Sequence, residues 1–490
     1  MKKLIIPIIV AVILAAGIGA FFILQKPAFS EPPSTTMKIN NGKILFSREE
    51  QDILTGSNER IEKYRKASAV LNIVTEDGRP VNNASVEIEQ QDHEFLFGLN
   101  NSVIMQALIS SKKYGTKIPK SLEKYDLSMQ DIDNYLEKFF GFANYTTLGG
   151  GWNMYENKKG EIDNRPYDAA INELHEHGIK VRAHSLVWNS NTPDWVPDDC
   201  DGLMQAIEKR IRDFLAYYNG KFDYFILANE AANPFRPIFK DDKMTPCIKK
   251  IGKHEFFARF FKIARETAPA AKLMINECSV FEKQGFSELL EALKDTNGQP
   301  LYDIIGIQSH MHQNLWTLDR VWKVAEGYSK FGVPIHFTEV TVLSGMPISG
   351  KGYDKEGKVL KQPGYEMKTT PEGEKIQAEY AANLYTVLFS HPAVEGIMWW
   401  NLTDHGSWKN APAGLLRDDM SSKPAYNALM DLIKKKWWTK VQTKTPDNGR
   451  AEFRGFLGTY KVTVTPKDGQ PKTFSVNLSK EGVREFKLEL

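Results

Sequence analysis

The sequence is poor in cysteine and almost neutral. It has 490 residues but only three cysteines, Cys200, Cys247 and Cys278, which cannot all pair with one another and whose spacing fits no zinc motif. One disulfide between Cys200 and Cys247, which are expected in successive loops, and three unpaired thiols are both compatible with the sequence. The formal net charge of +2 predicts no strong attraction to nucleic acid or to an acidic membrane surface.

The sequence also lacks a phosphate-binding turn. Gly149-Gly150-Gly151 is a glycine run, but the Lys-Ser/Thr pair of a nucleotide site does not follow it. We interpret this run as backbone that makes room beside a cleft. Because no glycine-rich phosphate turn follows any expected strand, an open doubly wound sheet is disfavoured.

The start of the chain is typical of a targeting signal. Lys2 and Lys3 precede an apolar run from Leu4 to Leu24, and about twenty apolar residues are enough to cross a bilayer. A cleaved signal peptide usually has a shorter apolar region of about 7–15 residues, although Ala28-Phe29-Ser30 could serve as a cleavage site. We interpret residues 1–30 as a signal anchor, with a cleaved signal peptide as the alternative. Either one predicts a membrane-anchored or secreted protein, at the cell surface or extracellular, that contacts a membrane only through this segment.

Strand-like segments occur at both ends of the remaining chain. Residues 68–92 and 445–490 contain short runs with alternating apolar residues and turns between them. Residues 31–67 are expected to be a linker with a short helix at Ile53–Lys66. A few strands at each end bury little by themselves, so we expect both ends to join into one small accessory β-sandwich. The alternative is two separate β extensions packed on the central domain.

Residues 93–437 alternate short apolar runs with helical patterns. Such a pattern indicates a parallel sheet covered on both faces, and eight units over this length match an α/β fold of the (β/α)8 TIM barrel type. The expected helices include Tyr167–His177, Leu203–Tyr218, His254–Thr267 and Leu318–Phe331. The expected strands are Phe95–Asn100, Phe142–Leu148, Lys180–Trp188, Phe222–Glu230, Lys272–Glu277, Asp303–His310, Pro334–Val340 and Gly396–Thr403.

Polar residues stand at the C-terminal ends of these strands, where the functional groups of such barrels collect. Glu230 ends the fourth strand and Glu339 the seventh, nearly opposite each other across a narrow barrel. Glycosidic cleavage needs one protonated carboxyl group for the leaving oxygen and one ionised carboxylate to attack the anomeric carbon. We therefore predict Glu230 as general acid/base and Glu339 as nucleophile, about 5–5.5 Å apart if configuration is retained. Each carboxylate alone would be read as a surface charge, but together they favour catalysis.

Other residues at this rim are predicted to bind the sugar. Asn229 could hold the 2-hydroxyl of the reacting sugar, through a bond that strengthens in the transition state. His310 could bridge to Glu339 and keep it ionised. The full set of predicted substrate-binding residues is His184, Trp188, Asn229, Gln308, His310, Trp400 and Trp408.

The same segments resemble glycoside hydrolase family 10, the endo-β-1,4-xylanases, over roughly Phe95 to Lys436. The resemblance implies a retaining hydrolase without metal or cofactor that acts on β-1,4-linked polysaccharide, xylan or a related hemicellulose. It also implies that His184 and Trp188 line the sugar subsite at the cleavage point. The matching segments are Val181–Trp188, Thr192–Trp195, Leu227–Ala231, Ile305–His310, Phe337–Val340, Trp400–Asp404, Ser407-Trp408 and Lys423–Tyr426.

The chain departs from the family pattern beside the cleavage point. The family's second strand carries Glu-Asn and, before its tryptophan, a lysine; here Thr147–Trp152 shares only the tryptophan. Asn189 replaces the histidine that usually follows Trp188, and Val340-Thr341 stands where an acidic residue is usual. Each lost charged hydrogen bond is worth roughly 1.5–3 kcal/mol. The substrate is therefore expected not to be plain xylan, or the cleft to accept a differently decorated or larger sugar.

Three other functions are compatible with the sequence. A hydrolase with metal-activated water is one, because His184, His310, His312 and His405 lie near the rim; chelators would abolish its activity. The second is a non-catalytic extracellular glycan-binding protein on the same barrel, which would bind without turnover. The third is a cell-surface adhesion protein that acts through its terminal β domain.

Overall fold

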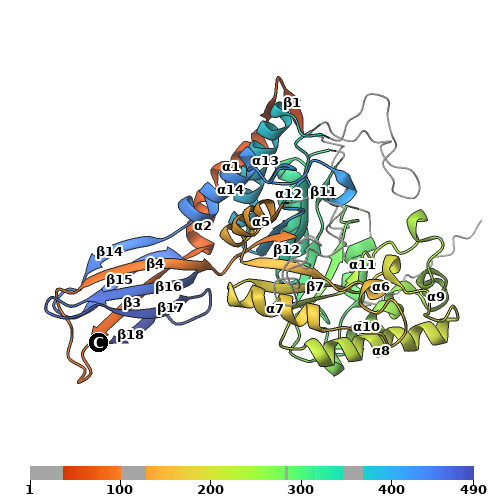
Figure 1. Ribbon diagram of the computed structural model, residues 1–490, viewed down its shortest axis with the longest axis horizontal. Helices are drawn as coiled ribbons and strands as arrows, with labels where there is room; N and C mark the ends of the chain where they lie inside the picture. Colours follow the sequence, from red (N-terminus) through yellow and green to blue (C-terminus); the bar gives the residue numbers. More distant parts are fainter. Residues whose placement is uncertain (1–36, 101–127, 282–284, 313, 346–367) are drawn as a thin grey trace, which may run out of the picture.

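The computed structural model describes residues 37–100, 128–281, 285–312, 314–345 and 368–490 (Figure 1). The predicted signal segment, residues 1–30, lies outside these ranges. Among the residues inside them, no helix combines the length and the apolar character needed to span a membrane.

The central domain is a closed barrel of parallel strands, which confirms the predicted (β/α)8 class. The sheet runs in the order β10-β9-β8-β7-β6-β5-β13-β12-β11, and a further pairing of β10 with β12 closes the ring. The strands are β5 (Leu96–Asn100), β6 (Tyr145–Gly149), β7 (Lys180–Val187), β8 (Tyr224–Asn229), β9 (Leu273–Glu277), β10 (Ile304–Ile307), β11 (His310–Met311), β12 (Ile335–Val342) and β13 (Val394–Trp399).

Helices form the outer layer of the barrel (Figure 1). The apolar residues of the first one, α5, recur every three or four positions and face the core, and a capping box between Ser128 and Asp131 fixes where it begins. The helices of this layer are α5 (Met129–Phe142), α6 (Trp152–Tyr155), α7 (Arg165–Glu176), α8 (Cys200–Tyr218), α9 (Met244–Ile251), α10 (Lys253–Thr267), α11 (Gly285–Ala292), α12 (Leu318–Ser329), α13 (Pro371–Ser390) and α14 (Pro424–Asp431).

All eight predicted strands differ from the observed ones in at least one bound, and the eighth ends at Trp399 instead of Thr403. Two of the differences, in the second and the sixth strand, have a clear physical reason. The second was expected to begin at Phe142, but Phe142 is the last residue of α5, where it continues the buried face of Phe139. The sixth was expected to run through to His310, but Ser309 has a φ of 56° and separates β10 from β11. A positive φ at a non-glycine residue does not fit a continuous strand.

The accessory domain is one β-sandwich built from both ends of the chain, as predicted. One sheet has the order β14-β4-β16-β17 and the other β15-β3-β18. Apolar side chains of both sheets, among them Leu71, Val86, Val462 and Leu488, form a single core cluster. The strands are β3 (Lys66–Val74), β4 (Ser85–His93), β14 (Lys440–Lys444), β15 (Arg450–Phe456), β16 (Gly458–Thr465), β17 (Lys472–Leu478) and β18 (Glu485–Glu489). Two separate extensions are therefore excluded, and β14 begins before the boundary predicted at residue 445.

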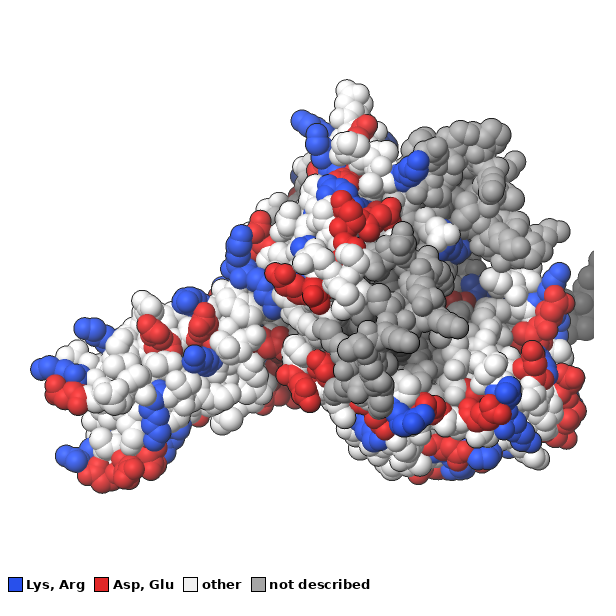
Figure 2. All heavy atoms as spheres, in the orientation of Figure 1, with Lys and Arg blue, Asp and Glu red and all other residues white. Residues whose placement is uncertain are grey.

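The accessory domain projects from one side of the barrel (Figure 1). Basic and acidic side chains are interspersed over the described part of the face in Figure 2, in keeping with the small net charge.

The linker predicted at residues 31–67 is wrong for its described part, although the short helix predicted at Ile53–Lys66 is present at Ser57–Tyr64. Residues 38–64 form a hairpin, β1 (Lys38–Asn40) with β2 (Lys43–Leu45), and two helices, α1 (Arg48–Thr55) and α2 (Ser57–Tyr64). Ile44 and Ile61 belong to the core cluster of the barrel, and α2 packs against α13. The segment is structured because it buries apolar side chains, which a flexible tether does not.

A disulfide joins Cys200 to Cys247, with Cα atoms 5.1 Å apart, and Cys278 is a free thiol. The two paired cysteines lie at the start of α8 and within α9, not in loops as expected. The bond ties together two neighbouring helices of the outer layer.

Candidate active site

The two predicted carboxylates meet in one polar network at the C-terminal ends of the strands. Gln308 Nε2 donates to Glu230 Oε1 at 3.2 Å and to Asn229 Oδ1 at 3.4 Å. Asn276 Nδ2 donates to the same Asn229 oxygen and to Glu339 Oε1, each at 2.8 Å. Two side-chain amides therefore link Glu230 to Glu339 through Asn229.

Glu339 is held as an ionised carboxylate. It is 4% exposed, and His310 Nε2 lies 3.0 Å from its second oxygen. Burial raises the pKa of Glu339, but the hydrogen bond and charge of His310, with the charges of His184 and Arg182, outweigh burial and lower it below its usual value. An ionised carboxylate in a water-poor site is a suitable nucleophile.

Thr341 orients His310 from the opposite side. Thr341 Oγ1 lies 2.8 Å from His310 Nδ1, at the position where the sequence departs from the family's acidic pattern. The same hydroxyl lies 3.2 Å from the backbone carbonyl of Glu339 and 3.3 Å from that of Trp400, so it can accept from His310 Nδ1 while it donates to a carbonyl.

Glu230 occupies an unusual backbone conformation beside a cation that sequence reasoning missed. Its φ is 56°, a region that costs a non-glycine residue of order 1–3 kcal/mol and that is concentrated at functional sites. Arg236 forms an ion pair with Glu230 Oε2 and donates to Cys278 Sγ at 3.1 Å. Arg236 lies in the loop after β8, and no motif in the sequence indicates that it turns back toward the rim.

The predicted aromatic and histidine residues gather on the same rim. The His184 ring centroid is 6.0 Å from that of Trp188 and 5.9 Å from that of Trp400. The His310 ring is 4.4 Å from that of Trp408. His184 Nδ1 and Trp188 Nε1 are buried without a hydrogen-bond partner among the described residues. Unpaired buried polar atoms are costly, and a hydroxyl-rich ligand would pair them.

Glu277 is a further carboxylate near the rim with a structural environment. It accepts hydrogen bonds from the backbone N–H groups of Ala232, Cys278 and Ser279, each at 2.8 Å. Burial raises the pKa of Glu277, and the charge of Glu230 adds to this. Glu277 thus anchors the loops after β8 and β9.

The residues that depart from the family pattern fall into two groups. Asn189 is buried and donates to Asp242 and Thr245, each at 3.2 Å, so it fixes the loop after β8. Gly149 lies at the end of β6, and a side chain added there would meet none of the described residues within 4 Å. Gly151 instead lies against the amide of Asn191. As far as the described residues go, the rim beside β6 therefore has open space at Gly149.

Histidines at the rim do not form a metal cluster in the part of the chain that the structure describes. No group of three or more His, Cys, Asp or Glu residues within it is arranged to hold a metal ion. Burial, with the charges of His310 and Lys409, lowers the pKa of His312 to about 2, so this histidine is neutral.

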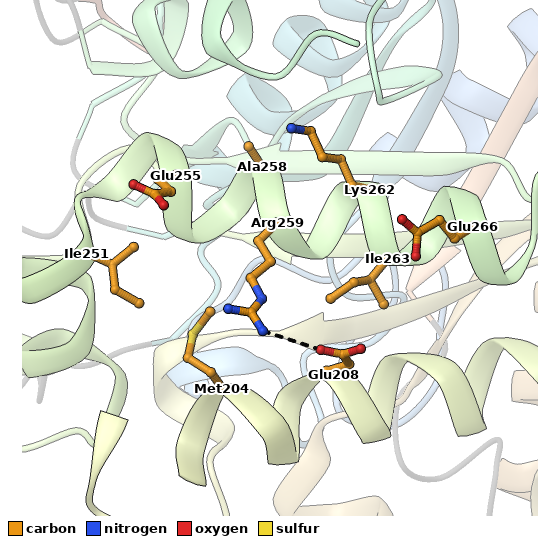
Figure 3. Close-up of a pocket in the computed structure, with 9 residues that line it drawn as sticks. All are labelled: Met204, Glu208, Ile251, Glu255, Ala258, Arg259, Lys262, Ile263 and Glu266. Atoms are coloured by element: carbon orange, nitrogen blue, oxygen red, sulfur yellow. Dashed lines mark ion pairs between the residues drawn. The ribbon is translucent and has the colours of Figure 1, made fainter. Parts of the chain in front are cut away.

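A separate hollow of about 600 Å³ lies in the outer layer between α8, α9 and α10 (Figure 3). Arg259 and Glu208 form an ion pair of 3.6 Å across it. The hollow stands among helices and not at the strand ends, so it is no candidate for the chemistry.

Curated relatives include two types of protein. The chain is 25% identical over 431 residues to the anti-sigma-I factor RsgI6 of Acetivibrio thermocellus, covering 86% of this chain and 48% of that protein. It is 26% identical over 362 residues to endo-1,4-beta-xylanase 2 of Arabidopsis thaliana, covering 70% of this chain and 30% of that protein. The chain thus spans about half or less of the length of these two relatives.

Solved structures agree on the fold. Native xylanase 10B from Thermotoga maritima superposes with a TM-score of 0.53 at 22% identity, over 70% of this chain and 96% of that one. Xylanase 10B from Thermotoga petrophila RKU-1 in complex with xylobiose gives 0.52 at 21% identity, over 70% and 95%. The family model of glycosyl hydrolase family 10 matches residues 113–432, which is more than half of the chain. The chain therefore belongs to glycosyl hydrolase family 10.

Proposed function

We propose that this chain is a retaining glycoside hydrolase that cleaves β-1,4-linked polysaccharide of the xylan type. The observation that carries the proposal is the network in which Asn229, Asn276 and Gln308 join Glu230 to Glu339. Family membership and the xylanase relatives support the same substrate class. The apolar N-terminal run further supports a location at the cell surface or outside the cell.

In the first step, a Glu339 oxygen attacks the anomeric carbon while Glu230 gives its proton to the leaving oxygen. The glycosidic bond breaks, and a covalent glycosyl-enzyme forms. His310 and Asn276 hold the two Glu339 oxygens, so the nucleophile is positioned before substrate arrives. Such pre-organisation avoids reorganisation in the transition state.

In the second step, Glu230 takes a proton from water, and the water oxygen attacks the anomeric carbon and releases Glu339. Both Glu230 oxygens accept hydrogen bonds, from Gln308 and from Arg236. That arrangement suits the ionised base of this step. In the first step Glu230 is protonated, and one of its oxygens no longer accepts a hydrogen bond from the protein. We propose that the bond from Arg236 is the one that is lost, because Arg236 lies on a loop.

We further propose that the chain prefers a decorated or larger sugar at the subsite beside the cleavage point. Thr147 and Leu148 lie at the end of β6 and carry no charge, and no described side chain or backbone atom fills the space beside Gly149 in the same rim. A side group on the sugar backbone would fill this space and gain burial.

The test is a panel of xylans, β-glucans and mannans with the wild type and Glu339→Ala. We expect Glu339→Ala to lose several orders of magnitude in turnover and azide to restore part of it by replacing the missing nucleophile. Undiminished turnover in Glu339→Ala would remove the assigned role. Plain xylan as the best substrate would remove the proposed preference, and an inverted anomeric product would contradict retention.

A second candidate is a non-catalytic glycan-binding protein. It is favoured by the uncharged Thr147 and Leu148 and by the match of 86% of this chain to a protein named an anti-sigma factor. Binding of a glycan by the wild type without any turnover in the same panel would select this candidate.

A further inference from the structure

Arg182 places a positive charge inside the barrel. It is 0% exposed, and its Nη1 and Nη2 atoms lie 4.0 Å and 3.4 Å from the sulfur atoms of Met274 and Met398. Its Nε donates to Thr147 Oγ1 at 3.4 Å. These three partners belong to β9, β13 and β6, so the guanidinium group reaches across the barrel interior from β7.

This cation has no adjacent anion in the described part of the chain. No carboxylate there lies within the 4.0 Å of an ion pair, and its nearest polar neighbours are uncharged. Tyr145 stands with its ring 5.6 Å away. Burial, with the charge of Arg182, lowers the pKa of His336 to about 3, so His336 is neutral. A buried charge without a partner is unfavourable unless another charge compensates at longer range.

The negative charge that compensates Arg182 lies one layer of side chains closer to the C-terminal ends of the strands. Side chains of a strand face the same side at every second residue, about 6.6 Å apart. His184 therefore stands one layer above Arg182, and Asn276 one layer above Met274. Asn276 donates to Glu339 Oε1 at 2.8 Å, which places the buried Glu339 carboxylate in the layer directly above the guanidinium group.

We propose that Arg182 is a positioning residue for the nucleophile, whose permanent buried charge keeps Glu339 ionised and in place; this rests on the proposed function. Arg182 is among the charges that lower the pKa of Glu339. The other groups that face Glu339 are His310, His184 and, across the mouth, Glu230. Burial lowers the pKa of His184, and Glu230 is itself an acid, whereas an arginine keeps its charge at every working pH.

The experiment compares Arg182→Met, which removes the charge, with Arg182→Lys, which keeps it. For Arg182→Met we expect the acidic limb of the kcat/KM profile to move up by about one pH unit, with about tenfold lower kcat/KM below the limb. For Arg182→Lys the limb should stay near its wild-type position. Identical limbs in the wild type and both variants would overturn the proposal.

A second measurement needs no turnover. A double-mutant cycle of Arg182→Met and Glu339→Gln in the free energy of unfolding should show coupling that shrinks as the pH falls toward about 4. If Arg182→Met fails to fold, Arg182→Gln takes its place in the cycle. If neither variant folds near neutral pH, the test is whether Glu339→Gln restores folding to them, and such recovery supports the proposal. Absence of coupling or of recovery overturns it. If Arg182 and Glu339 show coupling but the wild type has no turnover, the proposed function is refuted and the role of Arg182 is not.

Discussion

At the scale of single residues, the site depends on how His310 is held. Its Nε2 reaches Glu339 and its Nδ1 reaches the Thr341 hydroxyl. A ring fixed at both nitrogens keeps one geometry, and the hydrogen bond to Glu339 opposes the effect of burial on that carboxylate. We therefore expect the small polar residue at position 341 to influence the charge state of the proposed nucleophile through His310.

Thr341→Val removes this hydroxyl with little change in shape. Glu339 has a lowered pKa, so its ionised form contributes stability above the ordinary value of about 4.3 and the contribution is lost as the pH falls through the lowered value. With His310 less constrained, the acidic limb of kcat/KM should move up toward that value, with about a tenfold loss of kcat/KM at the limb. A pH profile measures both.

Thr386→Val is the matched control. Thr386 lies on α13, and its hydroxyl donates to the carbonyl of Ala382 at 2.8 Å, away from the site. Its profile should match that of the wild type. Equal limbs in Thr341→Val and Thr386→Val would show that Thr341 does not act through His310.

At the scale of elements, the disulfide fastens the outer layer of helices. Cys200 and Cys247 are 47 residues apart, and their bond joins α8 to α9. Closing a loop of this length restricts the unfolded chain and stabilises the fold by about 2–4 kcal/mol. Chemical denaturation should show that the free energy of unfolding of the Cys200→Ser/Cys247→Ser protein is lower by this amount. Reductant should destabilise the wild type to a similar extent.

Cys278→Ser is the control for this pair because Cys278 is unpaired. Its unfolding curve should not respond to reductant beyond the wild-type change. If the double variant unfolds at the same denaturant concentration as the wild type, α8 and α9 are held by packing alone.

The observed ends of helices and strands show where the spacing of apolar residues in the sequence fitted more than one structure. Phe142 ends an apolar stretch that reads as a strand, but it also continues the buried face of α5 after Phe139. Three-dimensional packing decides between the two patterns. Residues 31–67 were assigned to a linker with one short helix, although Ile61 of α2 is buried in the barrel core.

At the scale of the whole molecule, the two ends of the chain depend on each other. β3 pairs only with the C-terminal strands β15 and β18 in its sheet, and β4 lies between β14 and β16. Arg65, which precedes β3, donates to the backbone carbonyls of Phe389, His391 and Val394 next to the barrel. The accessory domain and the barrel are thus connected through buried bonds.

Deletion of residues 448–490 should therefore destabilise the chain. β3 would lose both neighbours and β4 one of them, and exposed strand edges promote aggregation. We expect reduced soluble yield and a lower melting temperature. Val483→Ser, at a side chain that is 69% exposed, is the control and should resemble the wild type. A soluble truncated protein with full activity would show that the barrel is independent, and would argue against an adhesive role for the β domain.

The order of apolar runs and polar strand ends was sufficient to predict the barrel, the accessory strands and the grouping of Glu230, Glu339 and His310 at one rim. These features follow from local periodicity and from the rule that parallel strands end on one face. The roles of Arg236, Asn276 and Arg182 required the tertiary structure. Their partners lie on other strands or loops, and a contact between such segments depends on how the ring closes, which no local pattern records.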